Sequence, residues 1–194
     1  MKPSVLIAGC LLAATALPAA AITTVYTTQL SGLNEAPPNA SPGTGMARVT
    51  VDTDAMTMRV EASFADLMAD VTIAHIHCCT ALPNVPPASP ATPVPSFPGF
   101  PSGVTSGAYD MTFDMSLEAS YNPGFIAGNG GTAASAFGAL VAGFNGQMAY
   151  FNIHTTVVPS GEISGFLHAI PEPETYALML AGLGLVGWAA RRRR

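Results

Sequence analysis

Two stretches in which apolar and polar residues strictly alternate constrain the fold of this chain more than any other feature. Residues 56–64 (MTMRVEASF) are apolar at every second position, and residues 110–117 (DMTFDMSL) repeat the pattern from Met111 to Leu117. Successive side chains of a β-strand point to opposite faces, so each stretch has one apolar and one polar face. This pattern predicts antiparallel strands with one face on a hydrophobic core and the other in solvent.

Shorter runs predict further strands, at 24–32, 46–52, 71–77, 147–155 and 161–168. Segments rich in Gly, Pro, Asn and Asp, such as NEAPPNASPGTG, separate these strands. Only residues 132–144 predict a helix, and it is a short one. About seven short strands with turn-rich connections predict an all-β fold, either an antiparallel β-sandwich or a Greek-key barrel.

A proline-rich segment interrupts this pattern. Residues 83–101 hold eight prolines in nineteen positions. Proline cannot donate to a strand ladder, so this density predicts an extended surface loop. The loop is either an arm that docks a partner or an insertion without a function of its own.

The first 21 residues have the layout of a secretory signal peptide. Lys2 precedes an apolar run, and Ala19 and Ala21 fit the small-residue rule for cleavage by signal peptidase. The alternative is a lipoprotein signal ending at Cys10, which follows Ile-Ala-Gly. Either signal exports the chain to an oxidising compartment, where cysteines can pair.

The C-terminal end combines an apolar segment with a basic cluster. Residues 176–190 are 15 uncharged residues, and Arg191, Arg192, Arg193 and Arg194 follow them. A helix of this length spans roughly 23 Å, less than the ~30 Å hydrocarbon core of a bilayer. Arginines that reach the headgroups make up the difference, which predicts a transmembrane helix over 176–190. The alternative is a buried apolar helix followed by a solvated tail.

The segment between the two ends, residues 22–170, suits a single domain. It holds ten acidic residues against two basic residues, Arg48 and Arg59. A field of this sign repels phosphate backbones, so the sequence argues against nucleic-acid binding.

The sequence AHIHCCT at 74–80 concentrates residue types that ligate metals. His75 and His77 lie two apart on a predicted strand, so their side chains point to the same face. Val71 and Ile73 are placed on that face too, which predicts that the histidines extend a core-facing row.

His154 and Glu162 are candidates to join this pair. His154 ends another predicted strand, and Glu162 follows it after a tight turn. If the two strands are neighbours, the three histidines converge within the reach of Zn²⁺ or Cu²⁺. Glu162 would then be a fourth ligand or would orient an imidazole.

The alternative is a structural cluster without a metal. Asn34 and Glu35 would join His75, His77 and Glu162 in a hydrogen-bonded group that fixes the turns of the fold. No recognisable nucleophile motif is present in the sequence, so we expect no enzymatic activity.

Cys78 and Cys79 are adjacent, and several interpretations stay open. A vicinal disulfide would shape the turn after the strand. The thiolates would otherwise ligate a metal beside the histidines, bridge to another chain, or remain two small buried thiols.

Pro171, Glu172 and Pro173, the apolar segment and the arginines stand in an order that resembles the PEP-CTERM sorting signal of Gram-negative bacteria. The resemblance implies that an exosortase recognises the tripeptide and removes the tail. The apolar helix would then be a transient inner-membrane anchor, and the mature protein would end near Pro171. It also implies association with extracellular polysaccharide and biofilm.

Three blocks, QLSGLNEAPPN, IAHIHC and YFNIHTTVVPSGEISGFL, resemble the CHRD domain over about residues 24–168. The resemblance implies a β-rich module without an established general activity. The chain departs from the family pattern at Cys78 and Cys79, where glycine and proline are common, and at Ser164, where a basic residue is common. We therefore expect a non-enzymatic envelope or biofilm component. The alternative is a metal-binding, redox-active protein that uses the His-x-His strand.

Overall fold

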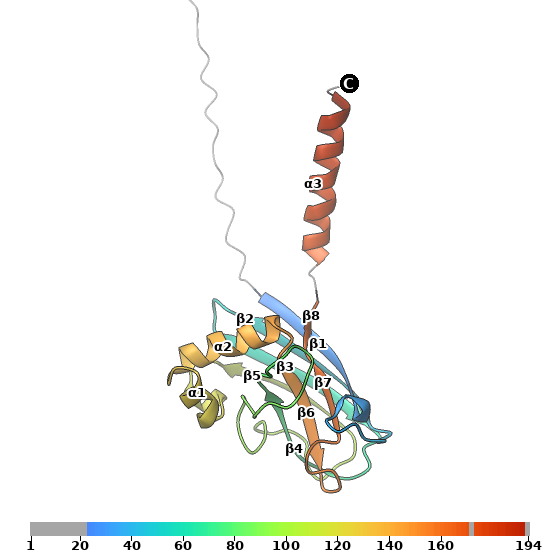
Figure 1. The fold of residues 1–194 in the computed structure, drawn as a ribbon, viewed down its shortest axis with the longest axis vertical. Coiled ribbons are helices and arrows are strands. Elements are labelled where there is room, and N and C mark those ends of the chain that lie inside the picture. Colours follow the sequence, from blue (N-terminus) through green and yellow to red (C-terminus); the bar gives the residue numbers. More distant parts are fainter. Residues whose placement is uncertain (1–22, 171–172, 193–194) are drawn as a thin grey trace, which may run out of the picture.

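The computed structural model describes residues 23–170 and 173–192, and its strands form a single antiparallel sheet (Figure 1). The predicted signal peptide, Pro171, Glu172, Arg193 and Arg194 lie outside the described residues. The strands are β1 (Thr23–Ser31), β2 (Thr44–Asp52), β3 (Thr57–Ala65), β4 (Val71–His77), β5 (Gly107–Asp114), β6 (Tyr150–Thr155), β7 (Ile163–Phe166) and β8 (His168–Ala169). Their order across the sheet is β4-β6-β7-β1-β2-β3-β5, and β8 pairs with β1.

The sheet is strongly curled into a half-barrel, whereas the sequence predicted an antiparallel β-sandwich or a Greek-key barrel. The antiparallel β character is confirmed, as are the positions of the seven predicted strands to within a few residues. A sandwich needs a second sheet to cover the first. Here β1, β2 and β3 pair along their whole length of nine residues, and long paired strands twist and coil instead of staying flat.

Helix α2 (Ala133–Asn145) is the helix predicted at 132–144, and it supplies much of what a second sheet would provide. Thr132 caps its N-terminus by accepting a hydrogen bond from Ser135 N–H. Its buried residues include Leu140 and Phe144, and the Phe144 ring lies 4.9 Å from that of Tyr26 on β1. The short helix α1 (Pro123–Gly128) was not predicted.

Within the described residues, the hydrophobic core lies between Tyr26 and Leu167. The alternation in 56–64 is confirmed, since Met58, Val60 and Phe64 are buried. Because the domain contains its whole core, a fragment of residues 22–170 should fold without the two ends of the chain.

The alternation in 110–117 is confirmed only in part. Phe113 and Met115 are buried, but Met111 is 37% and Leu117 54% exposed. Strand β5 lies at one edge of the sheet and ends at Asp114, so these two side chains have no neighbouring strand to cover them.

The proline-rich segment is an extended loop with many exposed positions, as the sequence predicted, but part of it is buried. It runs along the free edge of β4, where Thr92 Oγ1 accepts from Ile76 N–H at 2.9 Å and Ser96 Oγ accepts from Ala74 N–H at 2.9 Å. Phe97 from this loop is buried in the core. The loop thus pairs an edge strand without itself being a strand, and this protects the edge from pairing with another chain.

Helix α3 (Pro173–Arg192) extends away from the sheet in Figure 1. Leu180, Leu183 and Val186 on this helix are exposed, so the alternative of a buried apolar helix is wrong for these positions. The predicted transmembrane helix at 176–190 is not identified as a span, because no helix in the described part of the chain combines the length and the hydropathy that crossing a bilayer requires.

Candidate metal centre

The three candidate histidines lie on one face of two neighbouring strands. Strands β4 and β6 pair antiparallel with His75 opposite Asn152, His77 opposite Tyr150 and Ile73 opposite His154. Residues directly opposite in a ladder share a face. His154 is therefore the diagonal neighbour of His75, and the predicted convergence of the three residues is present in the structure.

This face is not the core-facing one that the sequence suggested. Ala74 and Ile76, which alternate with the histidines, belong to the hydrophobic core. A bulge between Val71 and Ile73 shifts the register, so Val71 turns to the core while Ile73 stays on the histidine side. The alternation template assumes an unbroken strand, and one extra residue reverses the faces on either side of it.

Loops cover the histidine face and fix each imidazole through its Nδ1 atom. His75 Nδ1 lies 3.2 Å from the carbonyl oxygen of Pro95, and His77 Nδ1 lies 2.7 Å from that of Ala88. Both carbonyls belong to the proline-rich loop. His154 Nδ1 lies 2.9 Å from the oxygen of Pro159, in the turn before β7. A carbonyl oxygen only accepts, so each contact requires the proton on Nδ1.

These contacts leave no proton for the Nε2 atoms. His75 Nε2 and His154 Nε2 lie 3.1 Å apart, and His77 Nε2 is buried without a partner among the described residues. A neutral imidazole has one N–H, which each ring has already donated through Nδ1. Two lone pairs therefore face each other, and a third is left unpaired nearby.

Protonation does not resolve the conflict at ordinary pH. Burial, with smaller contributions from His77 and His154, lowers the pKa of His75 to about 3. Burial also lowers the pKa of His77 to about 4, and it lowers the pKa of His154. The three rings are 3%, 8% and 6% exposed in the order His75, His77, His154. All three are thus held neutral, the state in which imidazole ligates a metal.

The three histidines could hold a metal ion, with His75 and His154 already at a ligand spacing. One ring nitrogen from each histidine lies within 4.8 Å of the others. Zn–N bonds of about 2.0–2.1 Å place two ligands of a tetrahedral ion roughly 3.3 Å apart, close to the spacing of His75 and His154. The Nδ1 contacts to carbonyls are the outer hydrogen bonds that usually orient metal-bound histidines. Figure 1 shows β4 and β6, which carry the three residues, side by side.

Glu162 does not belong to this cluster, so the prediction of a fourth ligand is wrong. Its fully buried carboxylate accepts three hydrogen bonds, from Ser41 Oγ at 2.6 Å, Met68 N–H at 2.7 Å and Thr155 Oγ1 at 2.6 Å. With both oxygens engaged, Glu162 ties three segments of the chain together.

Asn34 and Glu35 form a second group near the histidines. Asn34 Nδ2 donates to the Ser164 carbonyl oxygen at 2.9 Å, and the Glu35 carboxyl interacts with the side chains of Ser164 and Asn152. The single polar cluster predicted from the sequence is therefore three separate groups: the histidines, Glu162 with its donors, and Asn34 with Glu35. Asn152 was not predicted, although its position opposite the first histidine of a His-x-His strand would have placed it on this face.

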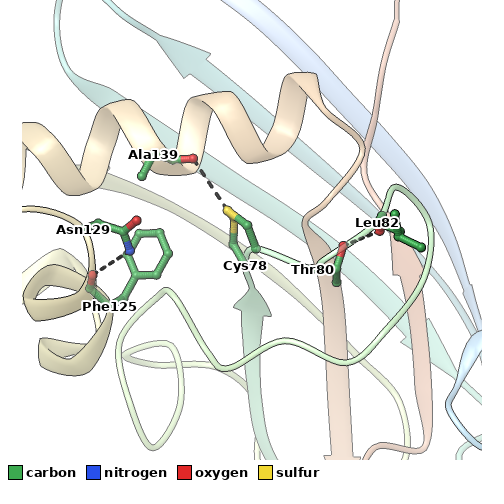
Figure 2. The surroundings of a disulfide bond; sticks show 7 residues. Cys78, Thr80, Leu82, Phe125, Asn129 and Ala139 are labelled. Carbon is green, nitrogen blue, oxygen red and sulfur yellow. Dashed lines mark hydrogen bonds between the residues drawn. A yellow bond between two sulfur atoms is a disulfide. The ribbon is translucent and has the colours of Figure 1, made fainter.

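A disulfide bond joins Cys78 and Cys79, one of the alternatives that the sequence left open. Figure 2 shows Cys78 beside α2, and Cys79 Sγ contacts the Ala139 carbonyl oxygen at 3.7 Å. The sulfur atoms are bonded to each other and lie outside the histidine cluster. The pair thus connects the end of β4 to the helix.

Gly143 on α2 provides a test of this packing. A Cβ atom at Gly143 would collide with both sulfur atoms, whereas a Cβ at Gly138 on the same helix meets no atom within 4 Å. Gly143→Ala is expected to lower the free energy of unfolding in urea by about 2 kcal/mol. Gly138→Ala, the matched control, should raise it by about 0.5–1 kcal/mol. Equal effects of the two substitutions would contradict this contact.

Family comparisons agree with the residue blocks identified above. The model of the CHRD domain matches residues 26–167, which include most of β1, all of β2 to β7 and the three clustered histidines. The chain belongs to the CHRD domain family. The PEP-CTERM protein-sorting motif matches residues 169–194 of this CHRD protein, which implies processing by an exosortase and suggests sorting to the cell surface. No curated protein and no solved structure matches the chain.

Proposed function

We propose that this protein is an exported, surface-sorted metal-binding module that holds Zn²⁺ or Cu²⁺ on His75, His77 and His154. The proton count at the three rings is the observation that supports the proposal. Every Nδ1 is oriented by a carbonyl, and the 3.1 Å contact between His75 Nε2 and His154 Nε2 has no proton to bridge it. A cation between these atoms turns the repulsion into ligation.

The donor set narrows the choice of metal. Neutral imidazole nitrogens suit Zn²⁺ and Cu²⁺, while Ca²⁺ and Mg²⁺ prefer oxygen ligands. With copper the site would be redox-active, and with zinc it would be structural. We do not attribute catalysis to the domain, and we assign it a role as a component of the envelope or of a polysaccharide-containing matrix.

Metal content tests the proposal directly. The 22–170 fragment, loaded with zinc or copper and desalted, is expected to retain about one equivalent by elemental analysis. His77→Asn keeps a donor for the Ala88 carbonyl but lacks Nε2, and it should reduce binding at least about tenfold. His168→Ala is the matched control, because His168 is exposed and lies outside the cluster. Retention of less than about a tenth of an equivalent of either metal would exclude the metal centre and leave the structural cluster.

The tail has a separate role in the proposal. We propose that α3 and the terminal arginines hold the precursor transiently at the inner membrane until an exosortase cuts near Pro171. The exposed apolar side chains of α3 and its separation from the sheet are consistent with a disposable anchor. Replacing Pro171, Glu172 and Pro173 by alanine should leave the full-length form in the membrane, as judged by intact mass. Unchanged release of a shortened protein would contradict recognition of the tripeptide.

A further inference from the structure

A cavity adjoins the histidine cluster, and three of the residues that line it carry buried polar atoms without a hydrogen-bond partner among the described residues. Glu35 Oε1, His77 Nε2 and Asn152 Oδ1 are the buried side-chain atoms that lack a hydrogen-bond partner within the described residues. All three residues line one cavity of about 260 Å³. An unpaired buried polar atom costs roughly 1–3 kcal/mol, so three residues of this kind around one space indicate a site for something that pairs with them.

A more open groove of about 380 Å³ lies next to the cavity. Asn34 and Pro86 line both spaces, and the outer groove adds Leu33 from one loop and Phe166 from β7. The site therefore has an enclosed end and a more open approach that is lined by both polar and apolar side chains. This shape fits a molecule whose terminal unit enters the cavity while the remainder lies in the groove.

Close packing fixes the positions of the polar side chains at the enclosed end of the cavity. Gly161 has φ +129°, and a Cβ atom there would lie 2.6 Å from Asn152 Nδ2 and 2.8 Å from Glu35 Oε2. Only glycine combines this backbone conformation with such an approach. The Glu35 carboxyl is further fixed by the side chains of Ser164 and Asn152, which leaves its Oε1 atom free.

We propose that this cavity binds the hydroxyl groups of a neutral sugar, as a free monosaccharide or as the terminal unit of a saccharide chain. The metal proposal accounts for His77 Nε2, but Glu35 Oε1 and Asn152 Oδ1 remain. Adjacent hydroxyl groups pair with a carboxyl oxygen and an amide oxygen together. The flat surfaces of Pro86 and Phe166 suit the C–H faces of a sugar ring.

An amine is the competing ligand. The protonation state of the Glu35 carboxyl distinguishes an amine from a sugar. Burial raises the pKa of Glu35 to about 7, so its carboxyl is found in both forms near neutral pH. A hydroxyl group donates to the ionised form and accepts from the protonated one, whereas an ammonium group pairs only with the carboxylate. No Lys or Arg is among the residues that line the cavity, so it also lacks a partner for an acidic sugar.

The test is a titration of the isotopically labelled 22–170 fragment in EDTA, followed by NMR. Glucose, galactose, mannose, N-acetylglucosamine, cellotriose and maltotriose are the probes, and triglycine represents amines. We expect at least one sugar to shift the side-chain signal of Asn152 and the amide of Gly161 with a Kd of about 1–10 mM. A trisaccharide that binds more tightly than its monosaccharide would show that the groove is occupied and that a chain end is the ligand.

Variants complete the test. Glu35→Ala should weaken sugar binding about tenfold, while Glu118→Ala, at an exposed position, should leave it unchanged. Glu35→Gln keeps a hydrogen-bonding oxygen and should retain binding, which also covers the case in which Glu35→Ala does not fold. Three outcomes would overturn the proposal: no sugar shifts these signals at about 50 mM, Glu35→Gln abolishes binding in its folded form, or only triglycine binds. Because EDTA is present throughout, failure here is distinct from failure of the metal centre.

Discussion

Replacing Glu162 with alanine is expected to lower the free energy of unfolding by about 4 kcal/mol, one of the two largest effects predicted for this domain. The carboxylate is fully buried and accepts from Ser41 Oγ, Met68 N–H and Thr155 Oγ1. These donors come from the β1–β2 loop, the β3–β4 loop and β6. Removing the acceptor leaves three donors unpaired, including the fully buried Thr155 hydroxyl and the half-buried Ser41 hydroxyl, and it separates the three segments that this carboxylate joins.

Urea unfolding of the 22–170 fragment measures this effect. Glu162→Gln keeps one oxygen that accepts, so it should cost only about 1–2 kcal/mol. Glu118→Ala removes an exposed carboxylate and should change stability by less than about 0.5 kcal/mol. If Glu162→Ala and Glu118→Ala unfolded at the same urea concentration, the carboxylate would not be the connection between these segments. Metal content of Glu162→Ala should stay near that of the unchanged protein, because Glu162 is not a ligand.

The strands were predictable because their pattern is local. In β3, burial of Met58, Val60 and Phe64 follows from the two-residue period of a strand alone. The order of the strands was not predictable in the same way. Whether β1, β2 and β3 curl as one sheet or pack against a second sheet depends on twist and on α2, which are properties of the assembled fold.

The proline-rich loop shows a second kind of structure that the sequence pattern could not predict. Its prolines correctly exclude a strand, but the pattern says nothing about Thr92 and Ser96, whose hydroxyl groups accept from the edge of β4. Burial of Phe97 within such a segment is likewise a tertiary effect. A prediction from composition placed this loop in solvent because prolines and small polar residues usually lie there.

At the candidate metal centre, the sequence identified the histidines that converge, but it did not identify the groups that hydrogen-bond to them. His75, His77 and His154 follow from strand periodicity and the pairing of β4 with β6. The carbonyl groups of Ala88, Pro95 and Pro159 that orient them are backbone atoms of loops, and no side-chain pattern reports them. Glu162 was misassigned because proximity in sequence to His154 does not show where a carboxylate finds its donors.

Acidifying the metal-free domain from about pH 7 to about pH 4.5 should lower its free energy of unfolding by roughly 2–3 kcal/mol. Burial lowers the pKa of His75 to about 3 and that of His77 to about 4 in the folded domain, from the ordinary histidine value of 6.5. Between these values the unfolded chain binds more protons than the folded one. The contribution of the two neutral histidines to stability is present above about pH 6.5. It is lost as the pH falls toward their pKa values in the folded domain.

Titration of Glu35 changes the stability of the domain in the opposite direction. Burial raises its pKa from 4.5 to about 7, so over part of this range the folded domain holds a proton that the unfolded chain has released. Its contribution to stability therefore increases as the pH falls. Glu35 is only partly buried, which reduces the effect through solvent screening. The two histidines outweigh it because each loses nearly a full proton relative to the unfolded chain.

Urea unfolding in EDTA at the two pH values provides the measurement. His77→Asn cannot take up a proton at this position, so it should remove about half of the histidine contribution, while Glu35→Gln should make the loss steeper. His168→Ala should lose as much stability on acidification as the wild-type domain, because His168 is exposed in β8. Stability that stayed constant or rose on acidification would mean that the folded histidines already hold protons. Those protons could bridge the Nε2 atoms of His75 and His154, and the argument for a metal between them would be lost.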